Sequence, residues 1–172
     1  DRDMHNGVVF APGENPPGSY NLFKGFPYEP VPGDWSILRG HILETLCQGN
    51  EEHFDWLMTW CAQIFQQPAR KMGSAVVIRG ARGSGKSTLF DYISMALGSH
   101  AAKVNNKAHI TGNFNSHHQG LLLLQCEEAF WGGDVQSGSV LKDLITSDRM
   151  LLEQKGVDAV QTANYVRLAM IS

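Results

Sequence analysis

The sequence predicts a mixed α/β fold in which a mostly parallel sheet is flanked by helices. A short apolar run, Ala75 to Ile78, is followed by a glycine-rich loop and an amphipathic helix over 86–97, the order that opens a parallel sheet. A second apolar run, Leu121 to Gln125, and a third over 165–171 predict two further buried strands. With 42% hydrophobic and 18% charged residues, the composition is that of one soluble globular domain.

An extended arm and a two-helix segment are expected before this sheet. Six of the seven prolines lie within residues 1–33, and proline removes an amide donor and fixes φ, so this stretch is predicted to be an arm rather than a helix. Its aromatic side chains predict that it packs on a surface. Residues 34–72 are predicted to form two helices, one over 35–48 capped by Asp34 and one that begins after Asn50 and ends before Pro68.

The remaining chain, 73–172, is predicted to form the α/β core. Besides the three strands, it is expected to contain a short helix over 140–146 and a hairpin over 149–162 that turns near Gly156. The chain begins at Asp1 without a methionine and stops within an apolar run, so we expect it to be a fragment of a longer protein.

Several classes of protein are excluded by composition. The three cysteines are too few and too widely spaced for a disulfide scaffold or a zinc ribbon, which favours a reducing compartment. No apolar run approaches the roughly 20 residues of a membrane span, so we expect a cytoplasmic protein without a membrane partner. The net charge of −3 does not indicate nucleic-acid binding. Residues 70–107, however, hold seven basic residues and one acidic residue, which suits a polyanion such as a nucleotide.

The glycine-rich loop carries the most specific motif. It follows the pattern G-x4-G-K-[ST] between a predicted strand and a predicted helix, which is the context that supports a phosphate-binding loop. Glycines let backbone amides converge on phosphate oxygens, Lys86 reaches the β- and γ-phosphates, and the Ser87 hydroxyl ligates Mg2+. We therefore predict ATP and Mg2+ as cofactors. The predicted nucleotide-binding residues are Gly80, Ala81, Arg82, Gly83, Ser84, Gly85, Lys86, Ser87 and Thr88.

Two carboxylates follow the second predicted strand. Glu127 and Glu128 are expected at the carboxyl edge of the sheet, where open α/β sheets bind ligands. We assign Glu127 to the Mg2+ shell and Glu128 to a water that attacks the γ-phosphate, so that Lys86, Glu127 and Glu128 form the predicted catalytic set. An acid that activates water favours hydrolysis over transfer to a small-molecule acceptor.

The order of these motifs resembles the ATPase domain of phage and prophage primase-helicases, within the superfamily-three helicases of the AAA+ class of P-loop NTPases. The resemblance covers most of the chain. It rests on the loop together with Asn21 to Phe26, Gln67-Pro68, Gly112 to Asn115, Glu127 to Gly133, Leu141 to Thr146 and Glu153 to Gly156.

The resemblance implies a motor that works as a ring, a hexamer in the full-length protein, on single-stranded DNA and beside a primase domain or partner. Lys142 and Lys155 match a motif whose hairpin touches DNA in the ring channel, so Lys155 is expected to contact phosphate. If the gene belongs to a phage, the protein is expected in the cytoplasm of the bacterial host. The family's sensor asparagine, arginine finger and lid would lie beyond Ser172, and nothing in the spacing of Arg149 or Arg167 favours either as that finger over a surface role.

The function predicted from the sequence is ATP binding and hydrolysis by the core of a DNA helicase or translocase in phage or mobile-element replication. A P-loop switch that assembles with partners but never unwinds DNA is the alternative. A P-loop kinase for a small metabolite is a third reading. DNA-stimulated turnover separates the first two, and a phosphorylated acceptor would identify the third.

Overall fold

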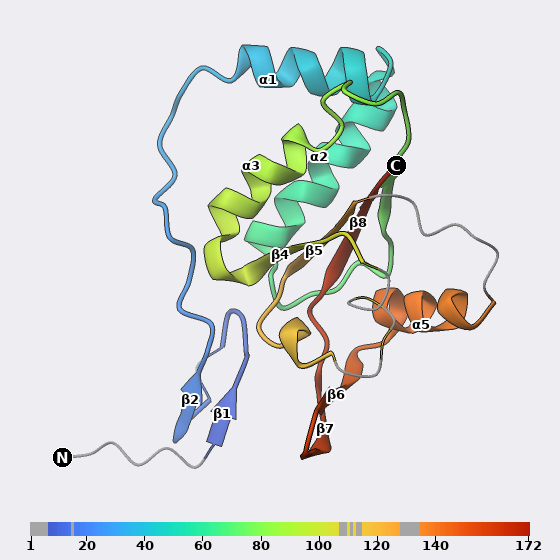
Figure 1. The fold of residues 1–172 in the computed structure, drawn as a ribbon. Helices are drawn as coiled ribbons and strands as arrows, with labels where there is room; N and C mark the ends of the chain where they lie inside the picture. Colours follow the sequence, from blue (N-terminus) through green and yellow to red (C-terminus); the bar gives the residue numbers. More distant parts are fainter. Residues whose placement is uncertain (1–6, 15, 107–109, 111, 113–114, 128–134) are drawn as a thin grey trace.

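A four-stranded parallel sheet lies at the centre of the computed structural model, which describes residues 7–14, 16–106, 110, 112, 115–127 and 135–172 (Figure 1). The strand order is β3, β8, β5, β4, so the last strand of the chain is inserted between the first core strand and β5. The four strands are β3 (Val76–Ile78), β4 (Ala101–Val104), β5 (Leu123–Glu127) and β8 (Arg167–Ile171). The predicted mixed α/β fold with a parallel sheet is confirmed.

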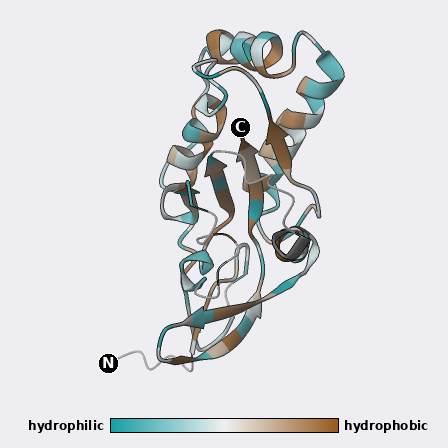
Figure 2. Ribbon diagram, turned by 45° about the vertical axis from the view of Figure 1, so that its right-hand side comes forward, coloured by the Kyte–Doolittle hydropathy of each residue, from teal (hydrophilic) through white to brown (hydrophobic). Residues whose placement is uncertain are grey.

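Helices cover both faces of this sheet. Ala169 and Ile171 of β8 join the core formed with α2 (Glu51–Gln66) and α3 (Thr88–Leu97), whose Trp60 and Phe90 rings meet edge to face. The alternate residues Leu168 and Met170 join a second core with Leu144 of α5 (Val135–Thr146). Figure 2 shows the hydrophobic residues gathered in the central strands, as expected for a sheet that is buried on both sides.

Several boundaries differ from the predicted ones. β5 begins two residues later than expected and carries Glu127 as its last residue. Helix α5 begins at Val135 rather than near 140, because glycine and serine in its first turns hide the helical pattern. β4 was not predicted at all, since alanine and lysine favour strands weakly and this strand exists through its pairing with β5.

The first predicted helix is the largest correction. The α-helix α1 spans only Ser36–Gly40, and His41–Leu46 continue it as a π-helix in which the Cys47 amide donates to the Ile42 carbonyl. The Asp34 carboxylate accepts from the Ser36 amide, close to the predicted cap. In α2 the predicted cap is confirmed, because the Asn50 side chain accepts from the His53 amide. The π-helix buries Ile42 and Leu43, and its first residue, His41, bonds to the Gly85 carbonyl.

The arm contains a short parallel pair of strands that the prolines do not reveal, β1 (Gly7–Val9) and β2 (Ser19–Asn21). The Asn21 side chain ties this pair together by bonding to both the amide and the carbonyl of Ala11. The expected aromatic packing is present: Phe10 contacts Phe23 and Tyr165, and Phe26 contacts Phe65 of α2. The arm is thereby anchored to the core.

The predicted hairpin is also confirmed. Strands β6 (Arg149–Gln154) and β7 (Val157–Ala163) pair antiparallel, and Gly156 adopts the left-handed φ of +78° that the tight turn requires. The hairpin precedes β8 and lies at the end of the sheet opposite the carboxyl terminus of β8 (Figure 1). Among the described residues, no helix is long and apolar enough to cross a membrane.

Arg167 is buried, although the sequence favours no role for it beyond the surface. Its side chain is only 2% exposed and donates to the carbonyls of Gln67, Pro68 and Arg70, which follow α2. Burial lowers the pKa of Arg167 to about 10. Because the guanidinium is occupied inside the domain, it cannot reach a neighbouring subunit, and the role of Arg167 is to fasten the segment before β3 to β8.

Candidate functional site

The glycine-rich loop connects β3 to α3, and its Lys86 side chain hydrogen-bonds back to the start of the loop. Lys86 Nζ donates to the carbonyls of Gly80 and Ala81 at 2.7 and 2.6 Å. Gly83 and Gly85 adopt φ values of +80° and +73°, a region that residues with a Cβ rarely adopt. The loop thus has the turns that its glycines predict, and its ammonium group lies over the loop at the N-terminal end of α3.

A histidine from the first helical segment holds the other side of the loop. His41 Nε2 donates to the Gly85 carbonyl at 3.0 Å, and the same carbonyl accepts from the Thr88 amide that opens α3. A Cβ on Gly85 would lie 2.8 Å from His41 Cε1. Sequence reasoning missed His41 because it is 44 residues from Gly85 and belongs to no motif.

The end of β8 supports the base of the loop. The Ser172 amide donates to the Ile78 carbonyl at 2.9 Å, and the Gly80 amide donates to the Ser172 carbonyl at 3.1 Å. The first residue of the loop is therefore fixed by backbone pairing to the strand beside it.

A cleft of about 680 Å3 opens at this edge of the sheet. It is lined by the glycine-rich loop, by Glu127 at the end of β5 and by Ile171 and Ser172. The volume is in the range of small-molecule sites in proteins. Of the predicted nucleotide-binding residues, Ala81 and Thr88 do not line the cleft and the other seven do. Glu128 lies outside the described residues.

Glu127 does not stand alone at the cleft. Lys103 of β4 places its ammonium 2.7 Å from Glu127 Oε1 and 3.0 Å from Asp91 Oδ1 of α3. Burial lowers the pKa of Lys103, but hydrogen bonds to Glu127 and Asp91 outweigh this and raise it above the ordinary value. No sequence motif pointed to Lys103, whose strand was not predicted.

Asp91 is the shared partner in this network. Its Oδ1 also accepts from Nε2 of the buried Gln125 at 3.1 Å. Burial raises the pKa of Asp91, but hydrogen bonds from Lys103, Gln125 and Ser87 outweigh it and hold the pKa below its ordinary value. The network therefore reaches from the loop hydroxyl at Ser87 to the carboxylate of Glu127.

The chemistry of these oxygens fits Mg2+. Ser87 and Glu127 line the same cleft, and hydroxyl and carboxylate oxygens are ligands that Mg2+ accepts. In the part of the chain that the structure describes, no group of three or more His, Cys, Asp or Glu side chains could hold a metal. A Mg2+ ion bound with a nucleotide needs only one or two protein ligands, because phosphates and water fill its other positions.

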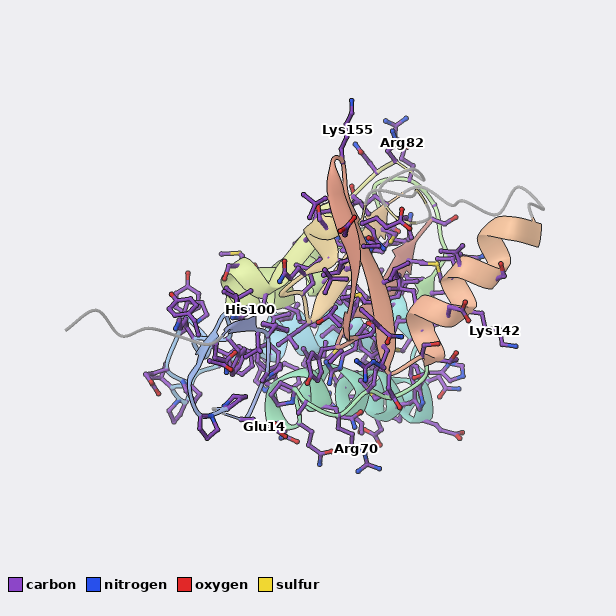
Figure 3. The ribbon with its side chains drawn as sticks, turned by 90° about the horizontal axis from the view of Figure 1, so that it is seen from below. Glu14, Arg70, Arg82, His100, Lys142 and Lys155 are labelled. Atoms are coloured by element: carbon purple, nitrogen blue, oxygen red, sulfur yellow. The ribbon has the colours of Figure 1, made fainter. Side chains whose placement is uncertain are left out.

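The described basic residues between 70 and 106 do not form one patch. Arg70 and Arg82 point to opposite sides of the molecule in Figure 3. Lys71 is half-buried and donates to the carbonyls of Leu144 and Ser147 at the end of α5. Among the described members of this set, only Arg82 and Lys86 line the cleft, and Lys107 lies outside the described residues.

The two predicted DNA contacts are not brought together either. Lys155 projects from the tip of the β6–β7 hairpin, whereas Lys142 projects from α5 in another direction (Figure 3). Both side chains are exposed. The hairpin lies at the end of the sheet opposite the carboxyl terminus of β8 (Figure 1), whereas Ile171 and Ser172 at that terminus line the cleft, so Lys155 is far from the cleft.

Residues 78–172, from the end of β3 through the loop to β8, match the model of a family described as a family of unknown function, DUF5906. The chain belongs to DUF5906. Its matched region contains the loop, Glu127, Lys103 and the hairpin, whereas the arm and α2 lie outside it. No curated protein matches the chain.

Solved structures share the fold. The apo structure of the NrS-1 C-terminal region (305–718) superposes with a TM-score of 0.82 at 22% identity, and the match covers 96% of this chain. A second, A-form apo structure of that region gives a TM-score of 0.81, also at 22% identity and 96% coverage. The chain spans only 42% and 41% of the length of these structures. At this identity the likeness establishes the fold, including the arm and helices outside the DUF5906 match.

Proposed function

We propose that this chain binds ATP with Mg2+ in the cleft and hydrolyses it, as the core of a motor that moves on single-stranded DNA during phage or mobile-element replication. The observation that carries the proposal is the loop between β3 and α3, with its lysine folded over it and Glu127 across the same cleft. A parallel sheet with a ligand site at its carboxyl edge supports it.

Each group has a definite task in this proposal. Lys86 leaves the carbonyls of Gly80 and Ala81 for the β- and γ-phosphate oxygens, which are stronger acceptors because they are charged. The loop amides and the N-terminus of α3 add positive potential. Ser87 and Glu127 hold the Mg2+, which supplies neutralising charge for the phosphates.

Glu128 is proposed as the general base. Its carboxylate would take a proton from a water molecule as that water attacks the γ-phosphorus in line with the bond to ADP. The bond between the γ-phosphorus and the bridging oxygen breaks, and ADP and inorganic phosphate leave. In the class of P-loop NTPases that the chain resembles, aspartate is the more usual residue at the position of Glu127, and either carboxylate can serve the metal shell.

The replication role is supported by the likeness to the NrS-1 C-terminal region and by the motif order of the primase-helicases. Because the chain spans less than half of that region, ring assembly, a hexamer and a primase partner are proposed for the longer protein. A ring also explains how a chain of net charge −3 could hold DNA. Phosphate contacts from hairpins of several subunits would add on one strand.

The first experiment measures ATP binding and hydrolysis at low salt by this chain and by Lys86→Ala, with and without single-stranded DNA. We expect turnover that rises with DNA and is lost in the variant. Glu128→Gln should bind ATP but hydrolyse it about 100-fold more slowly, the usual effect of losing one catalytic electrostatic group. Absence of nucleotide binding by the parent chain would refute the proposal. Tight binding without turnover in the longer protein would favour the switch instead.

The DNA contact has its own test and control. Lys155→Ala should keep basal hydrolysis, weaken DNA binding and reduce the slope of log affinity against log salt by about 0.7 per lost contact with a single strand. Lys24→Ala is the matched control, because Lys24 is also exposed but lies in the arm over the Tyr20 ring. Equal effects of the two substitutions would mean that Lys155 contributes only general charge.

A further inference from the structure

Lys103 is placed between two carboxylates by three separate elements. It belongs to β4 and pairs in register with Gln125 of β5, so its side chain emerges on the same face of the sheet as Gln125 and Glu127. That face is covered by α3, which brings Asp91 to the same ammonium. The arrangement is fixed by the sheet register and not by local sequence.

The three charged groups are not equally free to move. Asp91 is also held by the buried Gln125 and by Ser87. Among the hydrogen bonds of described residues, Glu127 is held through its side chain by Lys103 alone. The Lys103 side chain is 43% exposed and that of Glu127 is 33% exposed, so both can rearrange at the cleft. If the Lys103–Glu127 pair opens, Asp91 can keep the ammonium in place.

We propose that Lys103 is an internal counter-ion that positions Glu127 and competes with a divalent cation for its carboxylate. This inference rests on the function proposed above. With the cleft empty, the ammonium neutralises Glu127 and holds it beside α3. When Mg2+ and nucleotide bind, Glu127 turns from Lys103 to the metal shell, and Lys103 remains on Asp91. Lys103 is thus a positioning residue that sets how much divalent cation is needed to load the site.

Competition and simple structural support predict different results. The Lys103 ammonium and the Glu127 carboxylate lie 2.7 Å apart and attract each other, and a competing metal must overcome that attraction. Removal of the ammonium should therefore lower the Mn2+ concentration that half-saturates the site by about tenfold. If Lys103 only supported the fold, its loss would reduce stability and leave that concentration unchanged or higher.

The experiment uses the whole chain with a fluorescent, non-hydrolysable ATP analogue and Mn2+ in place of Mg2+. Protein-bound Mn2+ is followed by electron paramagnetic resonance, with the analogue alone as a blank, and analogue binding in EDTA is followed by fluorescence. The variants are Lys103→Met and Lys103→Gln, which remove the charge, and Lys103→Arg, which keeps it. Lys24→Met is the matched control. Thermal unfolding shows which variants are folded, and either neutral variant suffices.

The expected result is a Mn2+ midpoint about tenfold lower in the neutral variants and within about twofold of the parent in Lys103→Arg and Lys24→Met. A midpoint that is unchanged or higher in the neutral variants, with analogue binding intact, overturns the role of Lys103 and leaves the nucleotide site standing. Failure of the parent chain to bind the analogue in EDTA or with Mn2+ overturns both proposals.

Discussion

Replacement of Gly85 by alanine tests how the glycine-rich loop is held. Gly85 has a φ of +73°, and an added Cβ would lie 2.8 Å from Cε1 and 3.1 Å from Nε2 of His41. Gly83, two residues earlier in the same loop, has a φ of +80° and open space around its Cβ position. The two substitutions therefore share the backbone strain, and only Gly85→Ala collides with the histidine.

The magnitudes follow from these two contributions. A left-handed backbone costs a residue with a Cβ about 1–2 kcal/mol, and we expect Gly83→Ala to lower the free energy of unfolding by this amount. Gly85→Ala also displaces the His41 ring and breaks its 3.0 Å hydrogen bond to the Gly85 carbonyl, which adds about 1 kcal/mol. The expected loss for Gly85→Ala is about 2–3 kcal/mol.

Urea unfolding followed by tryptophan fluorescence measures these differences in the parent chain, both alanine variants, His41→Ala and the double variant His41→Ala/Gly85→Ala. Without the histidine ring, Gly85→Ala should cost no more than Gly83→Ala. The double-mutant cycle should give a coupling free energy of about 1 kcal/mol between positions 41 and 85. Equal losses for the two glycines, together with zero coupling, would refute the idea that His41 constrains the loop.

Three further predictions concern contacts outside the cleft. Arg167→Leu should lower the free energy of unfolding by about 3 kcal/mol in urea, because it leaves several carbonyls without their charged donor. Burial lowers the pKa of Lys71 from 10.5 to about 8. Between these pH values the unfolded chain therefore holds more protons at position 71 than the folded chain, so the stability of the parent relative to Lys71→Met should rise with pH, as measured by urea unfolding of both chains at each pH. Cys61 and Cys126, whose pKa values burial raises, titrate alike in both chains and cancel in this difference. Phe10→Ala should cost about 3–5 kcal/mol, since the ring is buried against Phe23 and Tyr165. The exposed Tyr28→Ala control should stay within about 0.5 kcal/mol in the same assay.

Elements with a strong local signal could be predicted from the sequence. Helix α2 has a capping asparagine, an apolar stripe and a proline after its end, and the structure places it at Glu51–Gln66. The hairpin has a glycine at its turn, and the loop motif lies between a strand and a helix as expected. In each case the hydrogen bonds that define the element join residues close in sequence, so a short window contains the information.

The features that were missed depend on residues far apart in the chain. β4 is a strand because it pairs with β5, and β1 is a strand because it pairs with β2. The π-turn at His41–Leu46 cannot be distinguished from an α-helix by apolar spacing, since it changes the period by only a fraction of a residue per turn. Arg167 was expected at the surface because its charge is visible in the sequence and the carbonyls that surround it are not.

In the candidate site, residues that belong to a sequence motif are held in place by residues that belong to none. Gly85, Gly80 and Glu127 belong to recognisable patterns, but each is held by a residue without one: His41, Ser172 and Lys103 respectively. The supports come from the first helical segment, from the inserted strand β8 and from β4. A nucleotide that moved the loop or Glu127 would therefore also disturb the contacts that these three distant parts of the fold make with them. Substitutions at His41 or Lys103 should alter the site even though neither residue lines the cleft.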